Sequence, residues 1–587
     1  MSESSSDLLS VQLTVNGKVS NAMIIKINVI QSINKIAKAT IVLNDGSKSK
    51  EDFKLSDSSE YNPGNKIEIK AGYHSKEKTI FKGLIMSQAI SIDAEEGPSL
   101  IIECKDEAFV TTNVHKNNYF LNSTDSEIIN KILGNYSVSK SVDSTKVKYE
   151  EVIQFGTTDW DFIVTRAEIN GLVTLTDDGK ISIKKPDLSG KSVLVLNYGD
   201  NIIEMDIAVG SQEQFESVEA ISWDASSQKL IEGKSQEPSV NNQGSITGKK
   251  LANVLGANEL LQSTIPLEKE ALDSWANAQL LKSRLSRFQG TILCEGNADV
   301  KPNTLIELKG IGKKINGNAY VSSVSHDLYE GRWITEITVG IQKNWFAQEV
   351  PVNALKAAGR IPAMNGLQIG IVKKTYDDPA GEFRVQVTLP LIKDSDEGIW
   401  ARLSTFYASI GFGNFFYPEV GDEVILGFLD DNPSAPIILG SVYSKKNIPT
   451  LTPDEKNTHK AITTRNLMTI DFDEEKKVIT IKTPGKNIIT LSDEDKGITL
   501  TDQNNNMVHL SDYGITIDSK KDIVIKAANN ISVSAVNIAV KANSNLDLSA
   551  NNITEKANMA FSAQAGASAE LKASGNVTVK GAMVSIN

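Results

Sequence analysis

Residues 478–525 read VITIKTPGKNIITLSDEDKGITLTDQNNNMVHLSDYGITIDSKKDIVI, and one short motif recurs in them every seven to ten residues. The motif places one polar residue between two apolar ones, and it continues toward residue 587. Its copies include Ile479-Thr480-Ile481, Ile489-Thr490-Leu491, Ile498-Thr499-Leu500, Val508-His509-Leu510, Ile515-Thr516-Ile517, Ile531-Ser532-Val533 and Val584-Ser585-Ile586. Because side chains alternate along a strand, both apolar residues of each copy lie on the same face.

A short fixed period predicts a stacked repeat architecture. One copy covers a single wall of a core and is too short to wrap a full turn. Either three successive copies close each turn, or three chains each supply one wall. The second arrangement makes a rigid triangular needle. Small residues that allow tight bends close many of the later copies, among them Ala527, Ala535, Ala542, Ala550 and Gly581.

Length and composition exclude several classes of protein. The 587 residues suffice for about four domains. A formal net charge of −12, with no basic cluster that has interleaved aromatics, predicts no nucleic-acid partner. Cys104 and Cys294 lie in strand-like runs, so we read them as buried free thiols. The first ten residues lack the pattern of a signal peptide, and no apolar run could span a membrane as a helix. We expect a protein assembled in the cytoplasm.

The region before the repeats contains an internal duplication. Residues 63–70 (PGNKIEIK) match residues 302–309 (PNTLIELK) position for position. We therefore predict two related hub β-barrels, over 1–115 and 201–355, the second with a long helix near 267–288. The alternative is convergence of two amphipathic strands, whose patterns are degenerate.

Two further segments complete the expected organisation of a mainly β chain. Residues 116–200 predict a small α/β insertion, in which Thr124 and Glu127 form a capping-box pattern and Thr158 opens a second helix. Residues 363–445 contain five short strands, which fit an OB-fold barrel that acts as a collar. The repeats at 460–587 form the needle.

Taken together, these segments resemble the VgrG-family spike proteins of contractile injection systems, which include type VI secretion, extracellular contractile systems and phage-tail hubs. The residues that carry the resemblance are Gly370-Ile371-Val372, the segments 384–390 (RVQVTLP), 400–402 (WAR) and 416–428 (FYPEVGDEVILGF), Asp431-Asn432-Pro433, 436–440 (PIILG) and the helix Asp159-Trp160-Asp161-Phe162. The resemblance covers the whole chain in the family's domain order.

The resemblance implies a homotrimer, and we predict that it is non-catalytic because no catalytic motif occurs in the sequence. Its two barrels per chain would form a six-fold-like ring that docks on a hexameric inner tube and baseplate proteins, and its needle would be a three-stranded β-helix. Sheath contraction would drive this point through a target envelope, so that contact with the membrane is transient puncture and effector cargo is delivered. The protein would be secreted or injected with the particle.

The C-terminal residues of the needle predict a binding site. The chain ends within the strand pattern, so the last layer would expose unpaired edges and an apolar base. We therefore expect a separate tip protein, a role that the resemblance assigns to PAAR-repeat cones. The predicted tip-protein contacts are Met583, Val584, Ser585, Ile586 and Asn587.

We find no pattern typical of catalysis, a cofactor or a metal. The five histidines lack ligand-like spacing, and His509 is predicted to point away from the apolar face. Asp430 and Asp431 fit a turn, and Asp159 and Asp161 fit a helix start. Catalytic motifs such as G-x-S-x-G and the P-loop do not occur.

Two alternatives remain open. A trimeric β-helical tailspike that binds or cleaves surface polysaccharide would need clustered carboxylates and aromatics on the repeats. A monomeric β-solenoid scaffold would close each turn within one chain. The oligomeric state separates this last alternative from the others.

Overall fold

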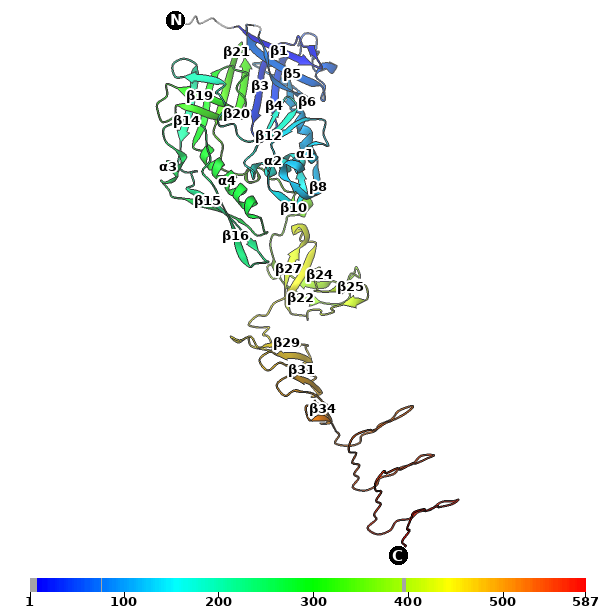
Figure 1. Cartoon of the computed structure of the whole chain (residues 1–587). Coiled ribbons are helices and arrows are strands. Elements are labelled where there is room, and N and C mark those ends of the chain that lie inside the picture. Colours follow the sequence, from blue (N-terminus) through cyan, green and yellow to red (C-terminus); the bar gives the residue numbers. More distant parts are fainter. Residues whose placement is uncertain (1–7, 75, 393–396, 587) are drawn as a thin grey trace. The chain divides into compact units, whose positions relative to one another are not determined.

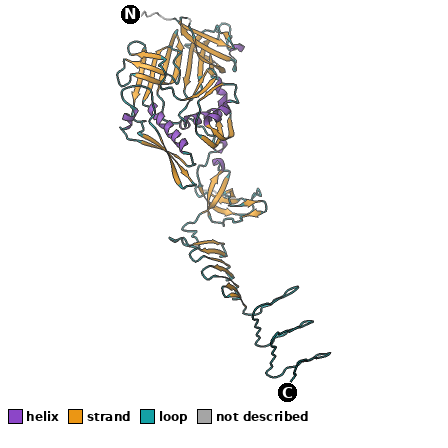
Figure 2. Cartoon of the chain, viewed as in Figure 1, coloured by secondary structure: helices purple, strands orange, loops and turns teal. Residues whose placement is uncertain are grey.

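The computed structural model describes residues 8–74, 76–392 and 397–586, and the chain divides into two units after Val442. The described chain has far more strands, drawn as arrows in Figure 1 and in orange in Figure 2, than helices. The predicted mainly β fold is therefore confirmed. Among the described residues, no helix is both long and apolar enough to cross a membrane.

The first half of the hub is an antiparallel sheet in the order β3-β4-β7-β6-β5-β1-β2. Alternate residues of these strands, such as Ile27 and Val29, or Ile41 and Leu43, are buried in one core. The strands are β1 (Leu9–Val15), β2 (Lys18–Val19), β3 (Ile24–Ser32), β4 (Lys38–Asn44), β5 (Lys66–Tyr73), β6 (Lys78–Asp93) and β7 (Gly97–Lys105).

The second half repeats this arrangement around its own core. Its strands follow the order β14-β18-β21-β20-β19-β13. They are β13 (Leu194–Asn197), β14 (Ile202–Val209), β18 (Phe288–Glu295), β19 (Leu305–Lys309), β20 (Gly317–Tyr329) and β21 (Arg332–Val339). The matched segments of the duplication fall on β5 and β19. One difference is that β13 pairs in parallel with β19, whereas β1 is antiparallel to β5.

The two halves share even their β-bulges. The β6–β7 register shifts between Ile85 and Ser87, and the β20–β21 register shifts at the corresponding Val321 and Ser323. The halves predicted as two barrels are joined, because β3 pairs with β20 and makes one thirteen-stranded sheet. A strand edge of one half is thus covered by the other half.

The segments between the hub strands carry the helices. Thr124 and Glu127 form the expected capping box of α1, and Thr158 caps α2. The predicted long helix is α4, from Lys269 to Leu285. The remaining elements are α1 (Asp125–Leu133), α2 (Asp159–Glu168), α3 (Gly248–Ala252), α5 (Phe346–Glu349), β8 (His115–Thr124), β9 (Ser139–Val142), β10 (Lys148–Thr158), β11 (Val173–Asp177), β12 (Lys180–Lys184), β15 (Ser217–Asp224), β16 (Lys229–Lys234) and β17 (Asn258–Ser263).

The collar is a closed barrel of five strands in the order β22-β23-β24-β28-β27. Val372, Val385, Val387, Ala401 and Val424 fill its interior. Its strands are β22 (Gln368–Lys374), β23 (Val385–Thr388), β24 (Ile399–Leu403), β27 (Glu423–Phe428) and β28 (Pro436–Ser441), and a short hairpin of β25 (Ala408–Ser409) and β26 (Phe412–Gly413) follows β24.

The C-terminal unit begins as a seven-stranded antiparallel meander. Its strands are β29 (His459–Thr463), β30 (Thr469–Asp473), β31 (Val478–Lys482), β32 (Ile488–Ser492), β33 (Gly497–Thr501), β34 (Met507–Ser511) and β35 (Gly514–Asp518). The sequence motif continues after residue 518, but the described residues 519–586 form no strand. A strand needs a neighbouring backbone, which one chain does not supply here, so the β-helical needle stays a prediction.

Acidification is expected to destabilise the hub through His326. Burial lowers the pKa of this imidazole from 6.5 to about 4. Its Nδ1 accepts a hydrogen bond from Trp333 Nε1 at 3.3 Å, an arrangement that a proton on Nδ1 would break. Between pH 6.5 and 4 the unfolded state therefore binds more protons. The free energy of unfolding should fall by up to about 3 kcal/mol over this window as pH decreases.

The measurement is the pH dependence of unfolding in the wild type and in His326→Gln. Asp106 contributes with the opposite sign, since burial raises its pKa to about 6, and both proteins retain that contribution. The stability of the wild type should therefore fall relative to that of the variant below pH 6.5. Parallel pH profiles of the two proteins would contradict the assignment.

Candidate functional site: the apolar face of the C-terminal sheet

The two apolar residues of each repeat meet those of its neighbours across the meander. The strand register aligns Ile481, Ile489, Leu500, Val508 and Ile517 in one row. A second row on the same face holds Ile479, Leu491, Ile498, Leu510 and Ile515. The repeat motif thus produces a continuous apolar face, as its alternation predicts.

The opposite face carries the middle residues of the motif. Thr480, Thr490, Thr499, His509 and Thr516 are cross-strand neighbours in one polar row. Oγ1 of Thr499 lies 2.9 Å from Nδ1 of His509. The prediction that His509 points away from the apolar face is confirmed.

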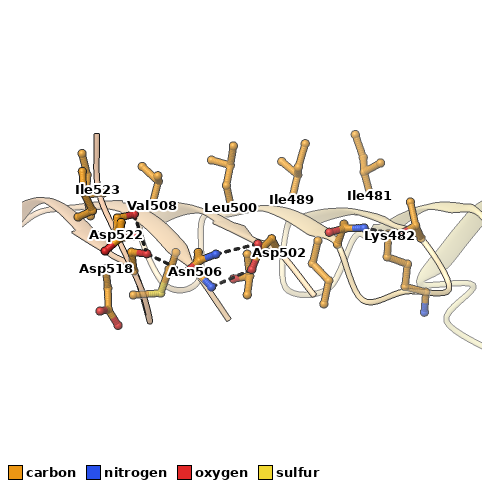
Figure 3. A pocket seen from close by; sticks show the side chains of 17 residues that line it. Ile481, Lys482, Ile489, Leu500, Asp502, Asn506, Val508, Asp518, Asp522 and Ile523 are labelled. Carbon is orange, nitrogen blue, oxygen red and sulfur yellow. Dashed lines mark hydrogen bonds between the residues drawn. The ribbon is translucent and has the colours of Figure 1, made fainter. Parts of the chain in front are cut away.

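The apolar face remains open to solvent. Figure 3 shows Ile481, Ile489, Leu500 and Val508 projecting side by side from one side of the sheet. They line a hollow of about 570 Å³. The relative solvent-accessible area is 39% for Ile489 and 41% for Leu500. A single sheet layer cannot bury its own face, so a second surface is needed to cover these rows.

The turns between the strands keep their charges at the edge of this face. Asp502 accepts hydrogen bonds from the backbone N–H groups of Asn504 and Asn506, at 2.9 and 2.8 Å. These bonds lower the pKa of the Asp502 carboxyl, and the bond from the Asn506 backbone has the largest effect. A carboxylate held in this way fixes the turn and stays out of the apolar rows.

The remaining repeats expose their apolar residues even more. Ile523, Ile531, Ile538, Leu546 and Val577 are all more than half exposed. Of the predicted tip-binding residues, Met583, Val584 and Ile586 are exposed and lie in the same extended segment as Ser585, whereas Asn587 is outside the described residues.

The acidic candidates have structural roles. Asp430 Oδ2 accepts a hydrogen bond from the backbone N–H of Ala358 at 3.1 Å, and Asp431 pairs with Lys356 at 2.9 Å. The two carboxylates therefore hold the segment that precedes the collar. Within the described part of the chain, no cluster of three or more His, Cys, Asp or Glu side chains could hold a metal.

Sequence reasoning missed two surfaces. Among the described strands, residues 87–93 of β6 pair only with β7, and β14 pairs only with β18, so each has one unpaired edge. The sequence could not reveal these edges, because they depend on which strands pair. The collar hairpin was missed although a signal exists: residues 403–418 contain no charged residue and include six Phe or Tyr.

Comparisons with known proteins agree with this organisation. Residues 5–330 match the model of the Alg8 N-terminal domain, and residues 368–443 match the type VI secretion system/phage-baseplate injector OB domain. The type VI secretion system spike protein VgrG3 of Vibrio cholerae is 32% identical over 103 residues, which cover 16% of this chain and 10% of that protein. The actin cross-linking toxin VgrG1 of the same species is 28% identical over 110 residues, or 18% of this chain and 10% of the toxin.

Among solved structures, a tail protein from Neisseria meningitidis has a TM-score of 0.43 and 16% identity, and the match covers 57% of this chain and 98% of that one. The matches to VgrG3 and to VgrG1 each cover about a tenth of the length of that curated relative. The barrel of residues 368–443 therefore belongs to the class of injector OB domains, and the chain is similar to VgrG spike proteins over part of its length. The chain belongs to the family of the Alg8 N-terminal domain, whose model matches more than half of its length.

Proposed function

We propose that this protein is the non-catalytic, homotrimeric spike of a contractile injection system. The observation that carries the proposal is the apolar face of β29–β35, which is continuous and is not covered by a second layer from the described part of the chain. Three such faces packed around a three-fold axis would cover one another. Burying the exposed remainder of each Ile or Leu would stabilise the trimer by about 1 kcal/mol per residue.

The same trimer would supply neighbouring strands with which residues 519–586 could form backbone hydrogen bonds. Their apolar–polar–apolar pattern continues that of the meander, and three interwound chains would offer each segment a neighbouring backbone. Such a rod has no lateral sheet edge, which suits a part that must resist unfolding under force. We also propose that the chain is organised as two hub barrels, an α/β insertion, a collar and a needle.

Two free strand edges in the hub support the trimer independently. Residues 323–329 of β20 are paired with β3, whereas the corresponding residues 87–93 of β6 are paired only with β7 among the described strands. Likewise β14, which corresponds to β3, is paired with β18 and with no other strand that the structure describes. We infer that β14 of one copy pairs with β6 of the next. Three copies would then close a ring of six related halves, which would match a hexameric tube.

The internal β3–β20 pairing predicts the register of this contact. Ser325 lies opposite Ile30 within the chain, and the corresponding residues are Ala89 and Ala208. We expect Ala89→Cys with Ala208→Cys to form disulfide-linked trimers, since residues directly opposite have Cβ atoms about 5 Å apart. The assay is a non-reducing gel. The native Cys104 and Cys294 are buried and should not interfere.

The control pairs Ala89→Cys with Glu204→Cys, which is displaced from the predicted partner by about 13 Å along the strand. This control should stay monomeric on the gel. Equal cross-linking of both pairs, or of neither, would contradict the register.

The C-terminal residues of the trimer are proposed to bind a separate tip protein of the PAAR-repeat kind. Met583, Val584, Ser585, Ile586 and Asn587 would supply the apolar base that such a cone covers. Deleting residues 580–587 should abolish binding of the tip protein in a pull-down and leave the trimer intact. Unchanged binding would remove this part of the proposal.

The remaining steps follow from the assembly. The ring would dock on the inner tube and baseplate, and contraction would drive the needle through a target envelope together with effector cargo. Assembly would take place in the cytoplasm, before secretion with the particle. A tailspike that cleaves polysaccharide is less well supported, since the described repeats from Lys520 onward contain no Trp or Tyr.

The experiment that tests the function is the mass of the native particle in solution. A mass of three times 63.7 kDa is expected. A monomer would mean that the apolar face is covered by something other than copies of this chain, and the piercing mechanism would be abandoned.

A further inference from the structure

The collar carries an exposed aromatic hairpin that the proposed spike function does not explain. Residues 403–418 have no charged side chain. Within them β25 pairs with β26, and the backbone N–H of Asn414 donates to Tyr407 O at 2.8 Å. Gly413 has a φ of +145°, and a Cβ there would lie 2.7 Å from Tyr407 O. The hairpin is therefore a defined structure that requires glycine at this position.

Its apolar side chains point away from its own barrel. Ile410 at the tip is 95% exposed and Phe406 is 89% exposed, while the rings of Tyr407 and Phe412, each more than half exposed, have centroids 5.8 Å apart. An ordered hairpin that presents such residues to water is typical of a surface that another molecule covers.

The same collar has a hollow of about 490 Å³, whose lining combines four aromatic rings with Thr375, Gly381 and the charged residues Asp377, Asp378 and Arg384. Tyr376 and Phe383 come from the loop after β22, and Phe415 and Tyr417 from the segment after the hairpin. Two contacts hold its wall: Tyr417 Oη donates to Phe383 O at 2.8 Å, and Arg384 pairs with Asp378 at 2.7 Å. The exposure of Ile410 means that the hairpin does not fill the hollow of its own chain.

We propose that the hairpin of each collar inserts Ile410 and its neighbours into the aromatic hollow of the next copy of the chain. The contact rests on the proposed trimer, which brings three collars together because each is joined by residues 442–458 to a shared needle. A contact between two different patches of one chain closes into a ring when the rotation matches, and three copies would satisfy every hairpin and every hollow.

Charge disfavours a lipid surface as the occupant. A hairpin that enters a membrane is usually flanked by several basic residues that attract anionic headgroups. Here the uncharged run is flanked by one Arg402 and by Glu419, in a chain of net charge −12. A second copy of the chain instead offers a hollow whose four aromatic rings would contact the hairpin.

Site-directed cross-linking of the full chain tests this contact. Ile410→Cys combined with Tyr376→Cys, treated with a short bismaleimide, should give covalent dimers and trimers. Ile410→Cys combined with Ser434→Cys, on the exposed loop between β27 and β28, should give at most a small fraction of that yield. Each single-cysteine variant should remain uncross-linked, because the native thiols are buried.

The native mass of the same variants separates the possible outcomes. A trimer with cross-links specific to the Ile410–Tyr376 pair supports the collar contact. A trimer with no cross-links, or with equal yields for both pairs, overturns it and leaves the spike function standing, whereas a monomer overturns both. Flotation of the wild type with phosphatidylcholine vesicles, lost in Ile410→Asp, would assign the hairpin to lipid and also overturn the contact.

Discussion

Replacing Ile489 by aspartate should abolish the proposed trimer, which we expect to resist SDS in unboiled samples, whereas aspartate at the adjacent Thr490 should leave it intact. Ile489 lies in the apolar row of β32, and Thr490 lies in the polar row on the opposite face. In the proposed needle, the three Ile489 side chains of one layer converge on the axis. Three buried carboxylates would cost several kcal/mol each, while three on the outer face would stay hydrated.

The readout is electrophoresis of unboiled samples, together with the native mass. The two substituted positions are adjacent and both gain the same charge. A difference in SDS resistance between the two variants therefore reports which face of the sheet is buried. If Ile489→Asp formed the resistant trimer as well as Thr490→Asp, the apolar face would not be the inner face. The single-layer sheet would then need another explanation.

Replacing Glu237, whose side chain is 48% exposed, by alanine should destabilise the hub by about 2–3 kcal/mol, because it would leave the buried Arg284 guanidinium without its counter-charge. The Arg284 side chain on α4 is 1% exposed. Its Nε and Nη2 donate to the two oxygens of Glu237 at 2.7 and 2.9 Å, and its Nη1 donates to Phe215 O at 2.8 Å. The measurement is the free energy of unfolding in denaturant.

The matched control is Lys78→Ala. Its ion pair with Asp299 has a similar 2.7 Å distance but is more than half exposed on both sides, so its loss should cost less than about 1 kcal/mol. Glu237→Leu combined with Arg284→Met should recover most of the lost stability, because it removes the unpaired charge. Equal, small losses in Glu237→Ala and Lys78→Ala would mean that water reaches Arg284.

Local patterns predicted much of the fold. The capping box at Thr124, the long helix on Lys269–Leu285 and the strand pair of the duplication depend on residues that are close in sequence, and the structure contains all three. The mainly β class and the five-stranded collar barrel followed from alternation in the same way. The joining of the two hub halves did not, because the β3–β20 pair links residues about 300 positions apart.

The sequence by itself determined the apolar face of the repeats. Alternation along a strand places Ile489 on one face and Thr490 on the other in any register that preserves the alternation. Only the tertiary structure decided that no second layer covers this face and that β6 and β14 each keep a free edge, as far as residues 8–74, 76–392 and 397–586 show. It also decided that the collar carries both an exposed hairpin and an aromatic hollow. The physical reason is that alternation is a property of one strand, whereas an unfilled edge or face depends on every strand that could have covered it.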